Sequence, residues 1–363
     1  MQLQSKLALC SLPVALFAVG PAFAQGQQQD FSAVQIKTHQ VPGNVYYVEG
    51  QGGNVGLLVG DDGVLMVDDQ FAPLSEKLQA AIKALSSKPI RMLVNTHVHG
   101  DHTGGNENFG KLGVGIVAHD NVRLPRAKGG NGAAPSPALA LPVVTYGARM
   151  SMHLNGETIT IGKLPPAHTD GDSFIHFAKA DVIHAGDVFR TTGYPGVDGN
   201  NGGTVKGTIE TLQALVDMAG PNTKIIPGHG VVSTRDDVAA FRTNTIEAQR
   251  RITELIKQGM TVEQVVAANP TADLARKFVT SGPAPDDMAT QRFLTAFYNA
   301  LKSELCSTPR AGARSKSLEP AARTDLPGRR RQRGIASAHG GRWVLRPWRP
   351  GRGVTGPATV IDP

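Results

Sequence analysis

Four side chains of the kinds that bind metal ions stand within six consecutive positions of this sequence. The stretch NTHVHGDHTGG, residues 95–105, contains His97, His99, Asp101 and His102. Imidazole nitrogens and carboxylate oxygens are ligands for Zn²⁺ and other divalent transition metals. A metal-binding helix would place two histidines at i and i+4 on one face, whereas this spacing suits an extended segment that turns into a loop. The pattern therefore predicts a metal site at the end of a strand.

Three further candidate ligands stand next to glycine or a turn, each after a predicted strand. His168 lies in LPPAHTDGDS, Asp187 in VIHAGDVF and His229 in IIPGHG. A histidine taken alone is more often a surface or core residue. Together with residues 97–102, however, they make seven nitrogen and oxygen ligands from four strand ends, a pattern that chance explains poorly. Strand-end loops on a rigid scaffold are a common place for chemistry.

The predicted elements that position these residues fall into two runs of strands, each followed by helices. Hydrophobic patterning and turn residues indicate an antiparallel meander over 34–69, a helix over 73–85, a buried strand at 90–94, a hairpin over 150–161 with its turn at Asn155-Gly156, strands over 173–189, a helix over 205–220, a strand at 223–230 and mostly helix over 234–304. This order predicts two sheets packed together with helices outside.

The order of the motifs resembles that of the metallo-β-lactamase superfamily. The sequence has H-x-H-x-D-H, then a histidine, then an aspartate in GD, then a histidine in PGHG, and the resemblance covers nearly all of residues 33–305. Asp68 in LMVDDQF matches the superfamily's first motif, an aspartate that supports the ligand loop. The resemblance implies an α/β fold, an αββα four-layer sandwich in which two mixed β-sheets are flanked by helices. The site would lie at one edge of the two sheets.

The resemblance also implies a division of the ligands between two metal ions. One ion would be held by His97, His99 and His168, the other by Asp101, His102 and His229, with Asp187 bridging them. Residue chemistry independently favours sharing, because four ligands within six residues cannot all surround one tetrahedral ion without strain. We expect two Zn²⁺ per chain. Fe and Mn are alternatives, because nitrogen and oxygen ligands do not exclude them. His99, where flavodiiron relatives carry glutamate, favours a hydrolytic zinc site.

A pair of such ions indicates a binuclear metal-dependent hydrolase, in which a hydroxide that bridges the two ions attacks the substrate. They lower the pKa of a shared water toward about 7, and Asp101 is the predicted catalytic residue that orients the water or carries its proton. The expected substrate is a small molecule with an ester, thioester or lactone-like bond. Classical metallo-β-lactamases carry cysteine or serine where this chain has Asp187, so it is more similar to the glyoxalase II and lactonase branch. Hydrolysis of a β-lactam ring is the alternative.

Residues 1–24 have the features of a cleavable signal peptide. Lys6 precedes the apolar run LALCSLPVALFAVG, and Ala22-Phe23-Ala24 forms a small-x-small cleavage site, with cleavage expected after Ala24. The apolar run is shorter than the roughly 20 residues that span a bilayer, so no stable membrane anchor is expected. These features predict a periplasmic or secreted protein whose hydrolase domain covers residues 25–305. The sequence does not predict its oligomeric state.

A basic tail, residues 306–363, follows the predicted domain. Positions 309–363 contain 12 of the 37 Lys and Arg residues but 3 of the 30 acidic ones, so this segment carries a charge of +9 and the rest of the chain −2. Its Arg, Gly and Pro content without periodicity predicts disorder, and a frame-shifted ending is another interpretation. The alternative function of another class is a non-catalytic metal- or nucleic-acid-binding protein that acts through this tail. The slightly acidic body offers no nucleic-acid docking surface, so no nucleic-acid partner is expected.

Two loops are predicted to select the substrate, residues 127–145 and 190–203. In the second loop Tyr194, Asn200 and Asn201 are candidates to contact a bound carbonyl group. The candidates for orienting His168 are Thr169, Asp172 and Ser173. Five further histidines match no ligand position and are predicted to be structural: His39, His119, His153, His176 and His184.

Overall fold

A computed structural model describes residues 30–130 and 133–307 of the chain. The predicted signal peptide, residues 1–24, lies outside the described residues, as does the predicted tail from residue 308 onward. Within the described ranges, no helix has the length and apolar character needed to cross a membrane.

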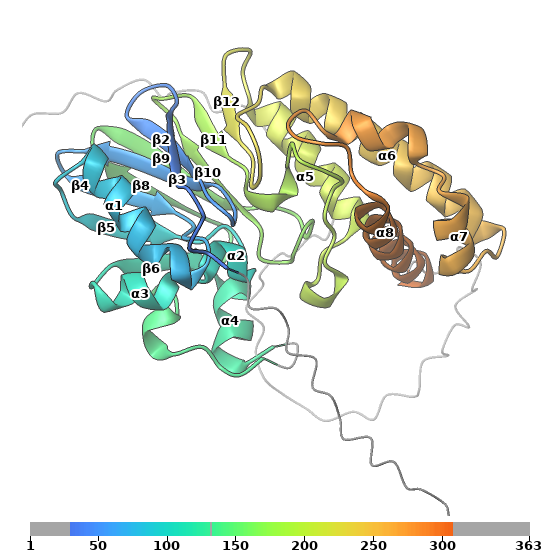
Figure 1. Ribbon diagram of the computed structural model, residues 1–363, viewed down its shortest axis with the longest axis horizontal. Helices are drawn as coiled ribbons and strands as arrows, with labels where there is room; N and C mark the ends of the chain where they lie inside the picture. The colour runs from blue at the N-terminus through green and yellow to red at the C-terminus, as the bar shows by residue number, and fades with distance from the viewer. Residues whose placement is uncertain (1–29, 131–132, 308–363) are drawn as a thin grey trace, which may run out of the picture. The chain divides into compact units, whose positions relative to one another are not determined.

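The first sheet has seven strands whose order in space follows their order in the chain (Figure 1). They are β1 (Lys37–Gln40), β2 (Val45–Glu49), β3 (Val55–Gly60), β4 (Gly63–Val67), β5 (Ile90–Val94), β6 (Gly115–His119) and β7 (Val144–Tyr146). The meander from β1 to β4 is antiparallel, and the pairings from β4 to β7 are parallel. The sheet is therefore mixed, as expected.

The second sheet has five strands in the order β12-β11-β10-β9-β8. They are β8 (Arg149–Leu154), β9 (Glu157–Lys163), β10 (Ser173–Phe177), β11 (Val182–His184) and β12 (Lys224–Ile226). The turn between β8 and β9 is formed by Asn155 and Gly156, both with positive φ, which confirms the predicted hairpin. β11 and β12 pair in parallel while the other pairings are antiparallel, so this sheet is mixed too.

The helices complete four layers, which confirms the αββα sandwich. The α-helices are α1 (Ser75–Leu85), α2 (Gly100–Thr103), α3 (Asn106–Lys111), α4 (Asp120–Lys128), α5 (Val205–Met218), α6 (Arg235–Lys257), α7 (Val262–Ala268) and α8 (Asp287–Ser307); the 3-10 helices are η1 (Ala72–Leu74), η2 (Ala138–Ala140), η3 (Gly186–Val188), η4 (Gly199–Asn201) and η5 (Ala272–Phe278). Figure 1 shows α1 and α3 beside the first sheet and α5 beside the second, with α6 and α8 farther out.

Three apolar clusters hold these layers together. The central one joins the facing sides of the two sheets, for example Val67 and Val94 with Ile175 and Phe177. A second cluster packs α1 and α3 on the outer face of the first sheet, and a third packs α5, α6 and α8 on the second. Alternation of apolar residues along the strands places one face of each sheet in each interface. Burial of these clusters supplies the main driving force for the fold.

The ends of parallel strands bring the candidate ligands to one edge of the sandwich. β4 and β5 are parallel neighbours in one sheet, and β11 and β12 are parallel neighbours in the other. The carboxyl ends of parallel strands lie at the same edge, and each of these four strands leads into a segment with a predicted site residue. Asp68, His97, Asp187 and His229 follow β4, β5, β11 and β12 respectively.

Candidate metal centre

Asp68 fixes the segment that carries the first four candidate ligands. Its carboxylate accepts hydrogen bonds from the Thr96 amide and hydroxyl, each at 2.7 Å, and lies 2.7 Å from Nδ1 of His102. Asp68 is fully buried and has a φ of 61°, a left-handed conformation that these bonds must hold in place. The resemblance predicted a supporting aspartate here, and its contacts fit that role.

His97 leaves one ring nitrogen available for a metal ion. Its Nδ1 lies 3.0 Å from the Thr96 hydroxyl, which already donates to Asp68, so Nδ1 carries the hydrogen. Its Nε2 is buried and has no hydrogen-bond partner among the described residues. Burial lowers the pKa of His97 well below its usual value, which keeps the ring neutral. A buried nitrogen lone pair without a partner is costly, and a metal ion would satisfy it.

His99 and His168 face each other, and residues 196–198 of one loop contact both side chains. Nδ1 of His99 lies 2.8 Å from Nε2 of His168, while the other nitrogens contact Asp198 Oδ2 at 2.8 Å and the Gly196 carbonyl at 3.1 Å. The Asp198 amide also donates to the His168 carbonyl at 2.9 Å. Partners of this kind fix the tautomer and the orientation of histidines that bind metals. Burial lowers the pKa of His168 to about 3.

Asp101 and His102 lie on α2, a single helical turn, and not in a loop. His99 precedes this turn in an extended conformation, and the Thr103 hydroxyl donates to the His99 carbonyl at 2.9 Å. Nε2 of His229 lies 3.3 Å from Asp101 Oδ2 and 3.4 Å from Nε2 of His102. Burial opposes ionisation of Asp101, but the hydrogen bond from His229 and the nearby His102 lower its pKa to about 2.

Asp187 lies between the two predicted ligand groups. It is on η3, and its Oδ1 is 3.0 Å from Nε2 of His102 and 3.3 Å from Nε2 of His229, although neither contact has the geometry of a hydrogen bond. Arg190 pairs with its other oxygen. Burial would raise the pKa of Asp187, but His229, Arg190 and His102 hold it well below its usual value.

Two glycines leave room for the closely spaced candidate ligands. A Cβ atom at Gly53 would lie 2.0 Å from the ring of His102, and one at Gly228 would lie 2.0 Å from Asp187 Oδ1. Any side chain at either position would therefore displace a candidate ligand.

The structure brings all seven predicted ligands together. Three overlapping groups have facing nitrogen and oxygen atoms within 4.8 Å of one another: His97, His99 and His168; His97, His102 and Asp187; and Asp101, His102 and His229. The first and third are the two sets that the resemblance implied, and the second joins them. A neutral buried histidine with a free lone pair, inside a donor set of imidazoles and carboxylates, fits a divalent transition metal.

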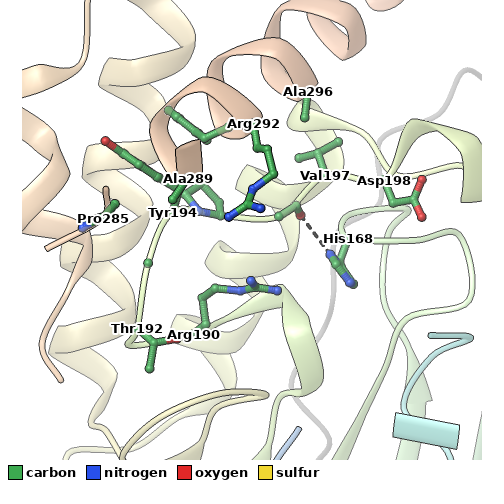
Figure 2. A pocket seen from close by; sticks show the side chains of 14 residues that line it. His168, Arg190, Thr192, Tyr194, Val197, Asp198, Pro285, Ala289, Arg292 and Ala296 are labelled. Carbon is green, nitrogen blue, oxygen red and sulfur yellow. Dashed lines mark hydrogen bonds between the residues drawn. The ribbon is translucent and has the colours of Figure 1, made fainter. Parts of the chain in front are cut away.

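A pocket of about 380 Å³ opens beside His168 and Asp198. It is lined mainly by residues 190–198 and by the side of α8 that bears Arg292 and Phe293, as Figure 2 shows. Tyr194, one of the predicted substrate contacts, lies in its wall with its ring stacked on Phe293 at 4.1 Å. A smaller cavity of about 210 Å³ lies beside His99 and is bordered by Gly130 and Ser136 of the other predicted loop.

Sequence reasoning missed several residues that contact the candidate ligands. Asp198 and Gly196 lie in the predicted substrate loop but were not named, and Arg190 stands one turn after Asp187. Asn201 donates to Asp198 at 2.7 Å, so it supports this loop. Asp172 accepts from the amide and hydroxyl of Thr169, which shapes the turn after His168, while the ring of His168 is oriented by Gly196.

The remaining histidines that were predicted to be structural lie outside the three ligand groups. His39 lies 2.8 Å from Glu49, His119 contacts the Gly147 carbonyl at 2.8 Å and His184 contacts the Asn54 carbonyl at 3.1 Å. For His119 and His184 these partners are backbone atoms of neighbouring segments, which suits residues that stabilise the scaffold.

Known proteins resemble this chain in sequence and in fold. Residues 48–230, about half of the chain, match the family model of the metallo-beta-lactamase superfamily. The alpha subunit of 2,4-dinitroanisole O-demethylase from Nocardioides sp. is 24% identical over 161 residues, which are 43% of this chain and 47% of that protein. The match thus spans about half the length of that curated relative.

Solved structures share the fold at low sequence identity. A metallo-beta-lactamase from Pontibacter korlensis superposes with a TM-score of 0.51 at 16% identity, covering 58% of this chain and 100% of that one. A stereoselective inverting sec-alkylsulfatase from Pseudomonas sp. superposes with a TM-score of 0.55 at 16% identity, covering 73% of this chain and 50% of that one. At such identities the likeness concerns the fold alone.

Proposed function

The chain belongs to the metallo-beta-lactamase superfamily, and on that premise we propose that it is a binuclear zinc-dependent hydrolase of a small molecule. The bond it cleaves would be an ester, thioester or lactone-like bond. Superfamily members are generally hydrolases, and this chain has a histidine and aspartate cluster that could hold metal ions. The number and identity of the ions, and the class of bond, belong to the proposal.

The observation that carries the proposal is the convergence of three overlapping ligand groups on one edge of the sandwich. His97 Nε2 is buried within this cluster without a partner, and Asp187 Oδ1 approaches two histidines without a hydrogen bond to either. Side chains arranged only for packing would satisfy such atoms with one another. Two separate groups that are joined by a third, which contains Asp187, suit a pair of ions.

Metal ions at these positions would supply an activated water and a Lewis acid for the substrate carbonyl group. The chain's own residues supply the remaining functions. Asp101 is ionised at neutral pH, and its carboxylate is part exposed, so it can accept a hydrogen bond from a reacting group and orient it. His102 and His229 hold that carboxylate from the buried side, at 3.7 and 3.3 Å. This placement favours Asp101 as the catalytic residue.

Arg190 would keep Asp187 in place and ionised. Its guanidinium group pairs with Asp187 Oδ2, which leaves Oδ1 facing His102 and His229. A cation beside a buried carboxylate stabilises the charged form that ligates metals. We also propose export through the predicted signal peptide, residues 1–24, and a small-molecule substrate without a nucleic-acid partner.

The test is to purify the full chain, measure metal per chain by elemental analysis and assay hydrolysis in the same preparation. The substrates would be a thioester, a lactone and a chromogenic cephalosporin, with a sec-alkyl sulfate and an aryl methyl ether included because the similar proteins are named for those classes. We expect about two zinc ions and turnover of the thioester or lactone, which a chelator abolishes.

Two variants make this test specific. His97→Ala should lose metal and turnover, whereas His153→Ala, which alters an exposed histidine on β8, should keep both. Fewer than one ion per chain, or full occupancy without turnover of any substrate, would contradict the proposal. Turnover of the cephalosporin alone would replace the bond class with a β-lactam.

A further inference from the structure

We propose that the pocket beside His168 is a substrate subsite for a small oxyanion, such as a carboxylate or a sulfonate, carried on an apolar body and bound by Arg292 with Arg190. The inference rests on the proposed function and deepens it, because it names the substrate class of the same site. It is carried by an unpaired guanidinium group in the pocket, by the pocket's apolar lining and by its size.

Two arginines reach the same pocket from opposite walls. Arg190 follows η3 and Arg292 lies on α8, and Figure 2 shows both guanidinium groups extending into the cavity. Arg292 is exposed and has no hydrogen bond or ion pair within the described part of the chain, while Nε of Arg190 is buried without a partner. Guanidinium groups bind oxyanions through paired N–H donors, so these free donors suit such a ligand.

The charged side chains of the lining differ in whether they have a partner. Asp198 is the acidic residue among the described residues that line the pocket, and its carboxylate already accepts from His99 and Asn201. Arg190 is balanced by Asp187, but Arg292 is not balanced by any carboxylate in the wall. The pocket therefore presents one guanidinium group, that of Arg292, without a carboxylate partner, and this group suits an anionic ligand.

The other walls are apolar. Tyr194 and Phe293 are stacked and nearly buried, and Val197, Ala289 and Ala296 complete the same surface. A volume of about 380 Å³ is that of a small-molecule site, too small for a folded partner. The combination suits a ligand with an aromatic or branched body and one anionic end.

The position of the pocket relates it to the reacting centre. His168 belongs to both the pocket wall and a candidate ligand group, and Asp198 in the wall contacts His99 of the same group. A substrate whose body fills this pocket would thus extend toward the candidate metal centre. Binding of its charged end at Arg292 would position the bond to be cleaved, since binding energy remote from the reaction orients the reacting group.

The test is a calorimetric titration of the purified full chain with three probes that share one body: 4-phenylbutyrate, 3-phenylpropanesulfonate and the neutral 4-phenylbutyramide. The unmodified protein should bind at least one anion about tenfold or more tighter than the amide. Arg292→Gln should remove that preference. Arg149→Gln, the matched control at an exposed arginine on β8, should retain it.

The outcomes separate the two proposals. Tighter binding of the carboxylate or of the sulfonate identifies which oxyanion the subsite takes. Equal affinity for anion and amide, no binding of any probe, or an unchanged preference in Arg292→Gln would overturn the subsite. The absence of turnover on every substrate would reject the proposed hydrolase but leave the titration to decide this inference. Where an anionic ester is turned over, Arg292→Gln should lower its kcat/KM about tenfold or more.

Discussion

His102 and His99 lie three residues apart on one short segment, yet different parts of the molecule hold them. The His102 side chain is fully buried, and its partner Asp68 is equally buried at the end of β4. The His99 side chain is 26% exposed, and its partner Asp198 lies in the loop that lines the pocket. One side of the candidate centre is thus held by the core of the sandwich, and the other by a loop that faces the proposed substrate.

The difference indicates that affinity for metal and affinity for substrate are linked more directly on the His99 side. Residues 196–198 contact both His99 and His168, so a ligand that shifts this loop also shifts two candidate metal ligands. On the Asp68 side, neither Asp68 nor His102 lines the pocket, and His102 is connected to the lining through Asp187, which pairs with Arg190. The following changes test this contrast, in order of decreasing effect.

Removal of metal should have the largest effect and should reveal the contrast directly. A chelator should abolish turnover, because the proposed reaction depends on the ions. In hydrogen exchange, the amide of Asp198 should then exchange about tenfold faster or more, since its acceptor His168 is no longer fixed. The amide of Thr96, which Asp68 holds at 2.7 Å, should change much less. Equal acceleration at both amides would contradict the contrast.

Asp68→Asn should have the next largest effect, and it should appear in stability. The change leaves three buried donors, on Thr96 and His102, with a neutral partner that can accept fewer hydrogen bonds. We expect the free energy of unfolding to fall by about 3 kcal/mol or more, measured by urea denaturation of the metal-depleted protein. Asp61→Asn, at an exposed carboxylate, should stay within about 0.5 kcal/mol. A loss of similar size in both variants would argue against the role of Asp68.

Asp198→Asn should weaken metal binding but leave the scaffold intact. The carboxylate orients His99, and loss of such a partner typically costs 10- to 100-fold in metal affinity, roughly the change expected here. Competition with a chromophoric chelator measures this affinity for each ion in turn. We expect one ion to be affected and the free energy of unfolding to change by less than about 1 kcal/mol. An equal loss of affinity for both ions would indicate that the Asp68 side and the Asp198 side of the centre are not independent.

His119→Asn should have the smallest effect of these changes. Because His119 lies outside the candidate metal centre, this variant distinguishes the scaffold's contribution to the pH dependence of stability from that of the centre. His119 accepts from the Asn121 amide and contacts the Gly147 carbonyl, so both ring nitrogens are used when the ring is neutral. Burial lowers its pKa below the usual 6.5, although the Gly147 contact opposes this. The unfolded chain therefore binds more protons, and stability that is present above about pH 6.5 is lost as the pH falls.

The measurement is the free energy of unfolding at pH 7.5 and 5.5. The unmodified protein should lose up to about 1 kcal/mol more than His119→Asn, whose side chain still caps α4 but does not titrate. An identical pH dependence in both proteins would show that His119 contributes nothing to the pH dependence of the free energy of unfolding. Such a result would leave the candidate centre as the main source of pH sensitivity.

The sequence predicted the layers and the seven clustered residues because both depend on short-range patterns. Alternation of apolar residues defined the strands, and motifs of a few residues marked their ends. The one-turn helix α2 was missed because its four residues, Gly100–Thr103, are too few to show a helical period.

The supporting contacts were harder to predict because they join distant positions. Asp198 and His99 are 99 residues apart, and nothing in the local sequence of either identifies the other. Arg292 stands on α8, more than a hundred residues after Asp187, where an arginine on an exposed helix is usually a solvated side chain. Only the packing of α8 against α5, α6 and α7 brings it to the pocket.

The spread of the candidate ligands over residues 97–229 also has a consequence for biosynthesis. None of the three groups lies within one continuous segment, because each combines residues from the end of β5 with residues that follow later strands. A growing chain therefore cannot assemble any of them until both sheets have formed and docked. Metal acquisition would be one of the last events in maturation, and a chain captured earlier would be a metal-free precursor.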